Sequence, residues 1–419
     1  MQRRDFLKAG AAGFATALAG CAATAPAAPK ARVVVVGGGY GGATAARYIR
    51  MLDPSIEVTL VEPNEAFVSC PISNMVLGGF RSMADITVPY SGLARHGVRV
   101  VRDTATAIDP QAKQVRLARG DTLAYDRVVV SPGVDFMWEA LPAMARSEAQ
   151  STVLHAWKAG PQTQELRRQL EAMRDGGVFV LAIPEAPYRC PPGPYERACQ
   201  VAAYFKAAKP RSKVVLLDAN ADVISKGPLF KKAWSELYRD IIEYRPSSKA
   251  VDVDVAGRIV KLEFADVKGD VLNVLPPMKA GSVAAPFITA NRRWCEVDWL
   301  TYESKAAQGV HVLGDSLQIA PLMPKSATMA NGQGKVCAAA VVALLNGEAP
   351  NASPTLVNTC YSMVSDKLAI HVASVHKYDE KDRTMKTVPG AGGVSGAMNE
   401  VEGTYTMNWA KNIWADTLA

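Results

Sequence analysis

The chain has 419 residues, of which 49% are apolar and 21% are charged, and its formal net charge is +7. This length suits two or three domains, and the apolar content excludes an intrinsically disordered chain. No run of lysine and arginine resembles a nucleic-acid-binding patch, and no stretch reaches the length of a membrane-spanning helix. The positive charge fits either a mildly basic soluble protein or a surface that docks an acidic partner.

Residues 1–29 have the features of an export signal. Arg3 and Arg4 precede a short stretch rich in alanine and glycine, too short and too weakly apolar to span a bilayer. This twin-arginine pattern predicts export of the folded protein to the periplasm, where disulfides persist. Cleavage near residue 29 is favoured, but residues 18–21 also resemble a lipoprotein cleavage box, which would leave a lipid anchor at Cys21.

Two segments, beginning at residues 31 and 177, share the order strand, turn, helix, strand. Short all-apolar strands that alternate with helical runs predict βαβ units and parallel sheets. We therefore predict an α/β fold with two Rossmann-like domains of the dinucleotide-binding type and a small α+β C-terminal domain. The predicted boundaries are 30–135 together with 296–348 for a discontinuous first domain, 136–295 for the second domain, and 349–419 for the C-terminal domain.

The first turn predicts a dinucleotide site. Gly37, Gly39 and Gly42 form a G-x-G-x-x-G motif between an apolar strand and a helix. In such a motif the glycines permit a tight turn, a close approach to pyrophosphate and close helix–strand packing, respectively. Glu62 ends the next strand and is expected to accept hydrogen bonds from ribose hydroxyls. Asp315 ends a later strand, "GVHVLGD", where an acid that holds a ribityl chain would favour FAD over NAD; a simple helix cap is the alternative.

The second turn lacks the donors that a nucleotide needs. Five prolines and only one glycine follow the strand at 178–183, in the stretch that contains Cys190. Because proline has no N–H and a fixed φ, we expect this domain to keep its architecture without binding NADH. Cys190 is expected at the carboxyl edge of the second sheet, where parallel folds place ligands. Glu196, at the start of the next helix, is a candidate proton acceptor, with a charge–dipole interaction at the helix N-terminus as the alternative.

The cysteines divide into groups by their surroundings. They are Cys21, Cys70, Cys190, Cys199, Cys295, Cys337 and Cys360. Cys199 and Cys337 lie on apolar helical faces and are expected to be buried structural thiols. No C-x-x-C-H motif occurs, so any haem belongs to a partner chain, and no zinc-type spacing predicts a metal site. Cys21 belongs to the predicted signal, and the surroundings of Cys295 are uninformative. Cys70, Cys190 and Cys360 are left, and spacing alone does not pair them.

At these residues the chain resembles the flavin-binding subunit of flavocytochrome c sulfide dehydrogenase, within the disulfide-reductase-like flavoproteins. The resemblance covers nearly the whole chain. It rests on "VVVVGGGYGGATAA", "DPSIEVTLVEPN", "HAWKAG", "RCPPGPYERA", "PLMPKSATMANGQGKVCAAAVVALL" and "NTCYS". The most discriminating of these is "RCPPGPYERA".

The resemblance implies roles for three cysteines. Cys190 and Cys360 would form a redox disulfide beside the isoalloxazine ring, and Cys70 would join FAD through a thioether, although "VSCPI" departs from the family's Y-x-C-Y pattern. The implied enzyme is a sulfide dehydrogenase in which hydrosulfide attacks the disulfide and sulfur leaves as elemental sulfur or polysulfide. FAD would then pass electrons singly to a haem on a c-type cytochrome subunit.

Three alternatives stay open at this point. A sulfide:quinone oxidoreductase has similar chemistry, and the aromatic tail at 405–419 is compatible with a membrane quinone as acceptor. An NADH-dependent disulfide reductase is disfavoured by the prolines of the second turn. A non-catalytic flavoprotein component of a thiosulfate-oxidising system would use the same fold without oxidising sulfide.

Overall fold

The first sheet is built from strands that are apolar along nearly their whole length. In the computed structural model, which describes residues 29–419, five such strands pair in parallel in the order β19-β9-β1-β2-β5. They are β1 Ala31–Val36, β2 Ile56–Val61, β5 Val98–Val101, β9 Arg127–Val130 and β19 Val310–Val312. Both faces of a parallel sheet are covered, which explains the continuous apolar runs. Because β19 comes from late in the chain, the sheet combines two separate stretches of sequence.

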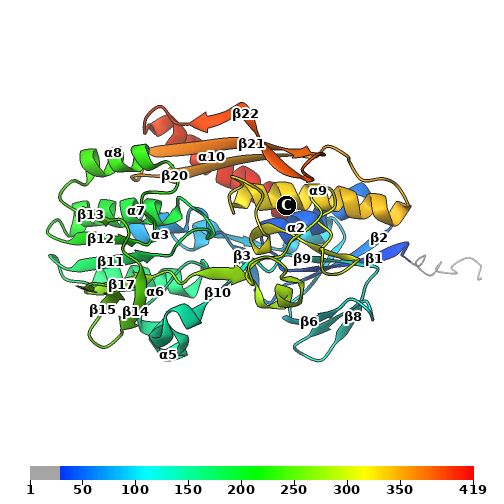
Figure 1. The fold of residues 1–419 in the computed structure, drawn as a ribbon, viewed down its shortest axis with the longest axis horizontal. Coiled ribbons are helices and arrows are strands. Elements are labelled where there is room, and N and C mark those ends of the chain that lie inside the picture. The colour runs from blue at the N-terminus through cyan, green and yellow to red at the C-terminus, as the bar shows by residue number, and fades with distance from the viewer. Residues whose placement is uncertain (1–28) are drawn as a thin grey trace, which may run out of the picture. The chain divides into compact units, whose positions relative to one another are not determined.

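Two long helices follow strands of this sheet and pack against each other (Figure 1). Helix α2, Tyr40–Leu52, begins at the glycine turn after β1. Helix α9, Ala327–Asn346, follows β19 and is capped by Ser326, whose Oγ accepts the Met329 N–H at 3.1 Å. Such a cap fixes where the helix starts. Both helices therefore begin beside the carboxyl ends of the parallel strands.

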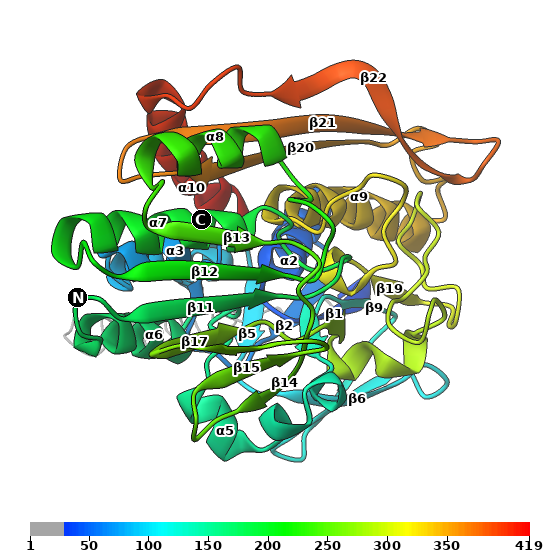
Figure 2. The same ribbon diagram turned by 60° about the vertical axis from the view of Figure 1, so that its left-hand side comes forward.

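The second sheet repeats this design (Figure 2). Its four strands are parallel in the order β13-β12-β11-β17. They are β11 Val178–Ile183, β12 Lys213–Asp218, β13 Ile242–Arg245 and β17 Val271–Val274, with helices α6 Pro161–Ala172, α7 Gly193–Ala208 and α8 Gly227–Leu237. Helix α7 connects β11 to β12, so the proline-rich loop opens at the carboxyl end of β11.

The C-terminal part is an antiparallel meander with a helix. Strands β20 Thr355–Met363, β21 Ala369–Asp379 and β22 Thr384–Val394 pair in sequence order, and α10, Glu400–Leu418, follows. Figures 1 and 2 both show these strands as a layer beside α9. β20 contacts both α9 and α7, so this layer reaches both halves of the molecule.

Shorter elements complete the structure. Small strands are β3 Ala66–Val68, β4 Thr87–Pro89, β6 Ala105–Asp109, β7 Gln114–Leu117, β8 Thr122–Ala124, β10 Val134–Phe136, β14 Ala250–Asp254, β15 Ile259–Leu262, β16 Asp266–Lys268 and β18 Met278–Ala280. Short helices are α3 Ser73–Gly78, α4 Ser91–Arg95 and α5 Ser147–Thr152. Two parallel sheets with a small α+β C-terminal part confirm the predicted fold class.

The predicted export signal at 1–29 falls almost wholly outside the described residues, as does Cys21. Export and lipid anchoring therefore stay predictions. Within residues 29–419, no helix combines the length and the apolar character that crossing a bilayer requires.

Candidate functional site

The glycine turn is shaped by the backbone that surrounds it. Gly37 has φ +99°, and a Cβ on it would lie 2.3 Å from the Ser131 carbonyl oxygen. A Cβ on Gly42 would lie 2.0 Å from the Gly37 oxygen, whereas a Cβ on Gly39 would meet no protein atom within 4 Å. Gly39 is the N-cap of α2 and provides no side-chain cap, so the N–H groups of the first turn are available to an anion. The turn is thus crowded by protein on two sides and open at Gly39.

Glu62 lies directly after β2 and is held by the same turn. Its Oε2 accepts the Gly38 N–H at 2.7 Å, and its Oε1 accepts the Asn64 N–H at 2.9 Å. The side chain is buried at the cavity wall. The carboxylate is therefore fixed at the place where a Rossmann fold presents an acid to ribose hydroxyls.

Asp315 follows β19 and lines the same cavity. Burial raises its pKa, and the nearby charges of Arg189 and Lys325 oppose that rise. Lys325 donates to the Asp315 carbonyl oxygen at 2.9 Å, and its ammonium lies 3.7 Å from the centre of the Trp294 ring. Burial lowers the pKa of Lys325 to about 7. Asp315 thus lies in the cavity wall near two cationic side chains.

One cavity of about 550 Å³ joins these groups. Its wall includes the residues that follow β1, β2, β9 and β19, so four parallel strands end at it. Ligands of α/β sheets bind outside the carboxyl ends of the strands, and small-molecule sites measure about 300–1,000 Å³. The open cradle at Gly39 and the carboxylates of Glu62 and Asp315 fit a dinucleotide such as FAD.

Cys190 sits in the same wall on a tightly held loop. Its φ of +58° lies in the left-handed region, which is uncommon for a residue with a side chain. Its N–H donates to the Lys325 oxygen at 2.9 Å, and its own oxygen accepts the Gly193 N–H at 2.9 Å. The Trp157 indole N–H donates to the Arg189 oxygen at 3.2 Å. These contacts restrict the direction in which the Cys190 thiol points.

The structure brings Cys360 to Cys190. Cys360 lies in β20 opposite Val372, and it lines the cavity. Both residues are half-buried free cysteines, and their thiols hydrogen-bond to each other. That hydrogen bond raises the pKa of Cys190 and is the main cause that lowers the pKa of Cys360 to about 7. The disulfide between them stays a prediction, but the two sulfurs are neighbours in the cavity wall.

Glu196 is buried beside this pair. It lies in the first turn of α7, lines the cavity, and accepts the Met363 N–H at 3.1 Å and the Asn74 amide at 3.2 Å. Burial raises the pKa of its carboxyl group. Its charge also raises the pKa of Cys190 and of Cys360, which shows that the three groups interact. Glu196 is therefore a buried carboxyl group near the two thiols, and its role as a proton acceptor stays a prediction.

Cys70 lines the cavity on the loop between β3 and α3. Its sulfur accepts the Ala159 N–H at 3.4 Å and lies 3.8 Å from the Trp157 oxygen. Cys70 thus shares the cavity with the glycine turn, as a thioether to the cofactor would require.

Arg197 is a functional-site residue that the sequence did not single out. The residue is 2% exposed, and its side chain extends from α7 to hydrogen-bond with three other segments. Its guanidinium donates to the Asn74 and Asn273 side-chain oxygens and to the carbonyls of His155 and Ala156. Burial lowers its pKa to about 9. Its partners are distant in sequence, so only its place in "YERA", next to Glu196, could have drawn attention to it.

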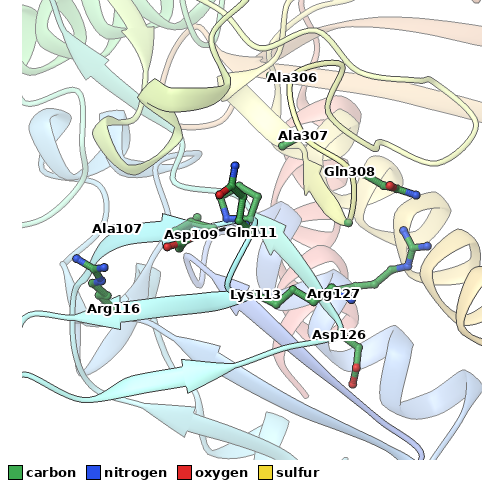
Figure 3. Close-up of a pocket in the computed structure, with 13 residues that line it drawn as sticks. Ala107, Asp109, Gln111, Lys113, Arg116, Asp126, Arg127, Ala306, Ala307 and Gln308 are labelled. Atoms are coloured by element: carbon green, nitrogen blue, oxygen red, sulfur yellow. Dashed lines mark hydrogen bonds between the residues drawn. The ribbon is translucent and has the colours of Figure 1, made fainter.

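A second hollow, of about 830 Å³, lies at the opposite end of the first sheet (Figure 3). It lies between the β6–β7 hairpin and residues 306–309, at the amino ends of β9 and β19. Two of its charged groups already have partners: Asp126 accepts the Arg32 N–H, and Arg127 pairs with Glu303. None of the predicted site residues lines it, so its larger size does not make it the candidate site.

The other cysteines lie away from the cavity. Cys199 and Cys337 are both 0% exposed, which confirms that they are buried, and Cys295 is equally buried. Within residues 29–419, no group of three His, Cys, Asp or Glu side chains is arranged to hold a metal ion. The chemistry of the cavity therefore concentrates on Cys70, Cys190 and Cys360.

Comparison with known proteins identifies the families that the chain matches. Residues 163–276 match the central part of the sulfide dehydrogenase (flavocytochrome c) flavoprotein chain, and residues 352–418 match the flavin-binding part of flavocytochrome c sulphide dehydrogenase. Residues 31–172 match the pyridine nucleotide-disulphide oxidoreductase family.

Three similar proteins illustrate the range of relatives. The sulfide dehydrogenase flavoprotein chain of Chlorobaculum thiosulfatiphilum is 73% identical over 45 residues, which are 11% of this chain and 94% of that sequence. A mitochondrial sulfide:quinone oxidoreductase of Dictyostelium discoideum is 24% identical over 303 residues, 68% of this chain and 65% of that protein. The match thus spans about two thirds of that relative.

The solved structure of the sulfide:quinone oxidoreductase of Aquifex aeolicus shows the same fold. It has a TM-score of 0.74 at 18% identity, with 92% of this chain and 91% of that chain covered. Together, the two family matches that include the cysteine loop and β20, and the high identity to the short Chlorobaculum sequence, assign the chain. It belongs to the family of the flavoprotein chain of flavocytochrome c sulfide dehydrogenase.

Proposed function

We propose that this chain oxidises sulfide at Cys190 and Cys360 and transfers the electrons through FAD to a c-type cytochrome subunit. The observation that carries the proposal is the meeting of these two thiols in the wall of the cavity at the glycine turn. A dithiol pair beside a dinucleotide site is the arrangement that exchanges electrons between sulfur and a flavin.

The reaction begins with thiol–disulfide exchange. Hydrosulfide adds to one sulfur of the Cys190–Cys360 disulfide, the S–S bond breaks, and its electron pair leaves on the other sulfur as a thiolate. A second hydrosulfide displaces the bound persulfide sulfur as hydrogen disulfide, the first polysulfide, and leaves the dithiol. A bound FAD would supply the acceptor for the electron pair when the disulfide re-forms, and flavin chemistry would allow electrons to leave one at a time toward a haem. Glu196 accepts a thiol proton in this step, because its raised pKa and its burial beside both sulfurs suit it to that exchange.

Two features of the second domain argue against NADH as the electron donor. Asp218 ends β12, where a nucleotide-binding domain would offer an acid to ribose, but its Oδ2 already accepts the Tyr195 hydroxyl at 2.7 Å and the Tyr244 hydroxyl at 3.0 Å. Asp218 is 0% exposed. With the prolines of the preceding loop, this supports a domain that does not use NAD(P)H.

An anaerobic titration of the purified holoprotein tests the proposal. We expect sulfide to bleach the flavin absorbance near stoichiometrically and NADH to leave it unchanged. Cytochrome c added afterwards is expected to restore the oxidised spectrum. Bleaching by NADH would contradict the proposal, and an unchanged spectrum with sulfide would favour a non-catalytic component of a thiosulfate-oxidising system.

A quinone acceptor is the second candidate. The likeness in fold to the Aquifex sulfide:quinone oxidoreductase favours it. The same titration with a soluble quinone analogue in place of cytochrome c separates the two, because only the true acceptor reoxidises the flavin at a rate that supports turnover. The proposed location is the periplasm, on the strength of the twin-arginine pattern in residues 1–29.

We further propose that FAD is joined to Cys70 through a thioether. The position of Cys70 in the cavity wall supports this. After denaturation and digestion, the peptide that contains Cys70 is expected to carry the mass of one FAD, and Cys70→Ala is expected to release its flavin on denaturation. Flavin that dissociates from the denatured wild-type chain would contradict the link while leaving the proposed reaction intact.

A further inference from the structure

Lys226 is a buried cation that lies outside the sequence motifs described above. It is 7% exposed and forms the N-cap of α8, with a left-handed φ of +56°. Its ammonium donates to the Cys360 carbonyl oxygen at 3.0 Å and to the Ser362 hydroxyl at 2.8 Å. Both contacts are with β20, the strand that carries one of the two site cysteines. Lys226 thus ties the second domain to the backbone of Cys360.

The charge of this ammonium lacks a close carboxylate. Among residues 29–419, Lys226 forms no ion pair with an Asp or Glu side chain, and the acceptors of its two hydrogen bonds, the Cys360 carbonyl and the Ser362 hydroxyl, are neutral. A buried ammonium is costly unless negative charge is nearby. Burial lowers the pKa of Lys226, and the groups that oppose this are, in order, Cys360, Glu196, Cys190 and Glu402. The ammonium thus lies against the backbone of Cys360, and among the ionisable groups around it Cys360 opposes the fall in its pKa most strongly.

We propose that Lys226 is a positioning residue that places the negative charge of the opened cysteine pair on Cys360 and so directs sulfide to Cys190. This inference rests on the proposed function and specifies the chemistry of the same site. Hydrosulfide forms its bond to the Cys190 sulfur, the S–S bond breaks, and the electron pair of that bond leaves on the Cys360 sulfur beside the ammonium. The persulfide keeps the hydrosulfide proton, so no other reactant is required.

The other charged groups around the pair do not remove this asymmetry. Glu196 raises the pKa of both thiols, and Arg189 lowers the pKa of Cys190 against the larger effects of the Cys360 hydrogen bond and burial. On the Cys360 side, the Cys190 hydrogen bond and then Lys226 lower the pKa, against burial. Cys360 is therefore the more acidic thiol and the better leaving group.

Alkylation of the reduced holoprotein tests the charge on each sulfur. The protein is reduced anaerobically, freed of reductant, and alkylated with iodoacetamide across a pH series, and each cysteine is read by mass spectrometry. We expect the Cys360 midpoint to lie below that of Cys190 in the wild type. In Lys226→Met it should rise by about one unit or more, because an opposite charge at this range lowers a pKa by about 1–3 units. Lys226→Arg should restore most of the shift.

Lys231→Met is the matched control, because Lys231 lies in the same helix, is half-exposed and pairs with Asp222. It should leave both midpoints unchanged. A Cys360 midpoint in Lys226→Met equal to that of the wild type would overturn the inference. Flavin content reports whether each variant is folded, and if Lys226→Met loses its flavin, the comparison is made with Lys226→Gln.

A wild-type experiment tests the direction of attack without any substitution. One equivalent of sulfide is added to the oxidised holoprotein, and the mixture is quenched with an alkylating agent and digested. The extra sulfur should be found on the Cys190 peptide, and its recovery on the Cys360 peptide would overturn the assignment. If sulfide fails to bleach the wild-type flavin, the proposed function fails, whereas the alkylation series still reports what Lys226 does to Cys360.

Discussion

Replacing either cysteine of the pair by serine should abolish the reduction of the flavin by sulfide. Cys190→Ser and Cys360→Ser each remove one sulfur of the disulfide that hydrosulfide attacks, and a serine hydroxyl cannot form or break that bond. The rate constant for flavin bleaching should fall by at least about 1,000-fold in each variant, because residues that act as one unit lose their effect together. Stopped-flow absorbance under anaerobic conditions measures this rate.

The double variant sharpens this expectation. If the two sulfurs act only as a pair, the double variant should bleach no more slowly than either single variant. Cys199→Ala is the matched control, since Cys199 lies in α7 close to Glu196 but is fully buried and outside the cavity. It should keep its flavin and bleach within about twofold of the wild-type rate. Wild-type bleaching in Cys190→Ser would show that sulfide reaches the flavin by another route.

Much of the fold could be predicted because local sequence determines it. The apolar runs at 31–36 and 178–183 belong to parallel strands that are covered on both faces. Such strands are recognised by a continuous apolar run in the sequence, whichever elements cover them. The glycine turn could be predicted from its motif, in which Gly42 lies against the Gly37 oxygen, although the backbone that crowds Gly37 belongs to Ser131, far away in sequence. Asp315 could be placed at a strand end from "GVHVLGD", and the structure puts that strand in the first sheet.

The composition of the site could be predicted only in part. Spacing left Cys190 unpaired, and it was the resemblance to a family that joined it to Cys360. The structure then placed the loop before α7, which carries Cys190, beside β20, which carries Cys360. Lys226 and Arg197 could not be predicted, because a charged residue in a helix is normally exposed and their burial depends on acceptors far away in sequence. The sequence left two roles open for Glu196, an acid at a helix end or a proton acceptor. In the structure its carboxylate accepts the Met363 N–H of β20, a contact that the local sequence could not predict.

Two glycine substitutions should separate cofactor binding from folding. A Cβ on Gly39 would meet no protein atom within 4 Å and would extend into the cavity, and its φ of −71° suits alanine. Gly39→Ala should therefore fold with wild-type stability, yet carry less than about a tenth of the flavin, a difference equivalent to at least about 1.4 kcal/mol of binding free energy. The measurements are flavin absorbance per chain and urea unfolding of the flavin-free protein.

Gly42→Ala should reduce both the folding stability and the flavin content. Its Cβ would lie 2.0 Å from the Gly37 carbonyl oxygen, a backbone atom that cannot move without shifting α2 away from β1. Overpacking of this kind costs about 1–3 kcal/mol, so the flavin-free variant should unfold at lower urea and should also lose the cofactor. If Gly39→Ala keeps its full flavin content, the open side of the turn does not face the pyrophosphate, and the cofactor must approach the cavity from elsewhere. If instead Gly39→Ala loses flavin while its unfolding matches the wild type, the first turn binds the dinucleotide through its backbone, because the added methyl group changes nothing else.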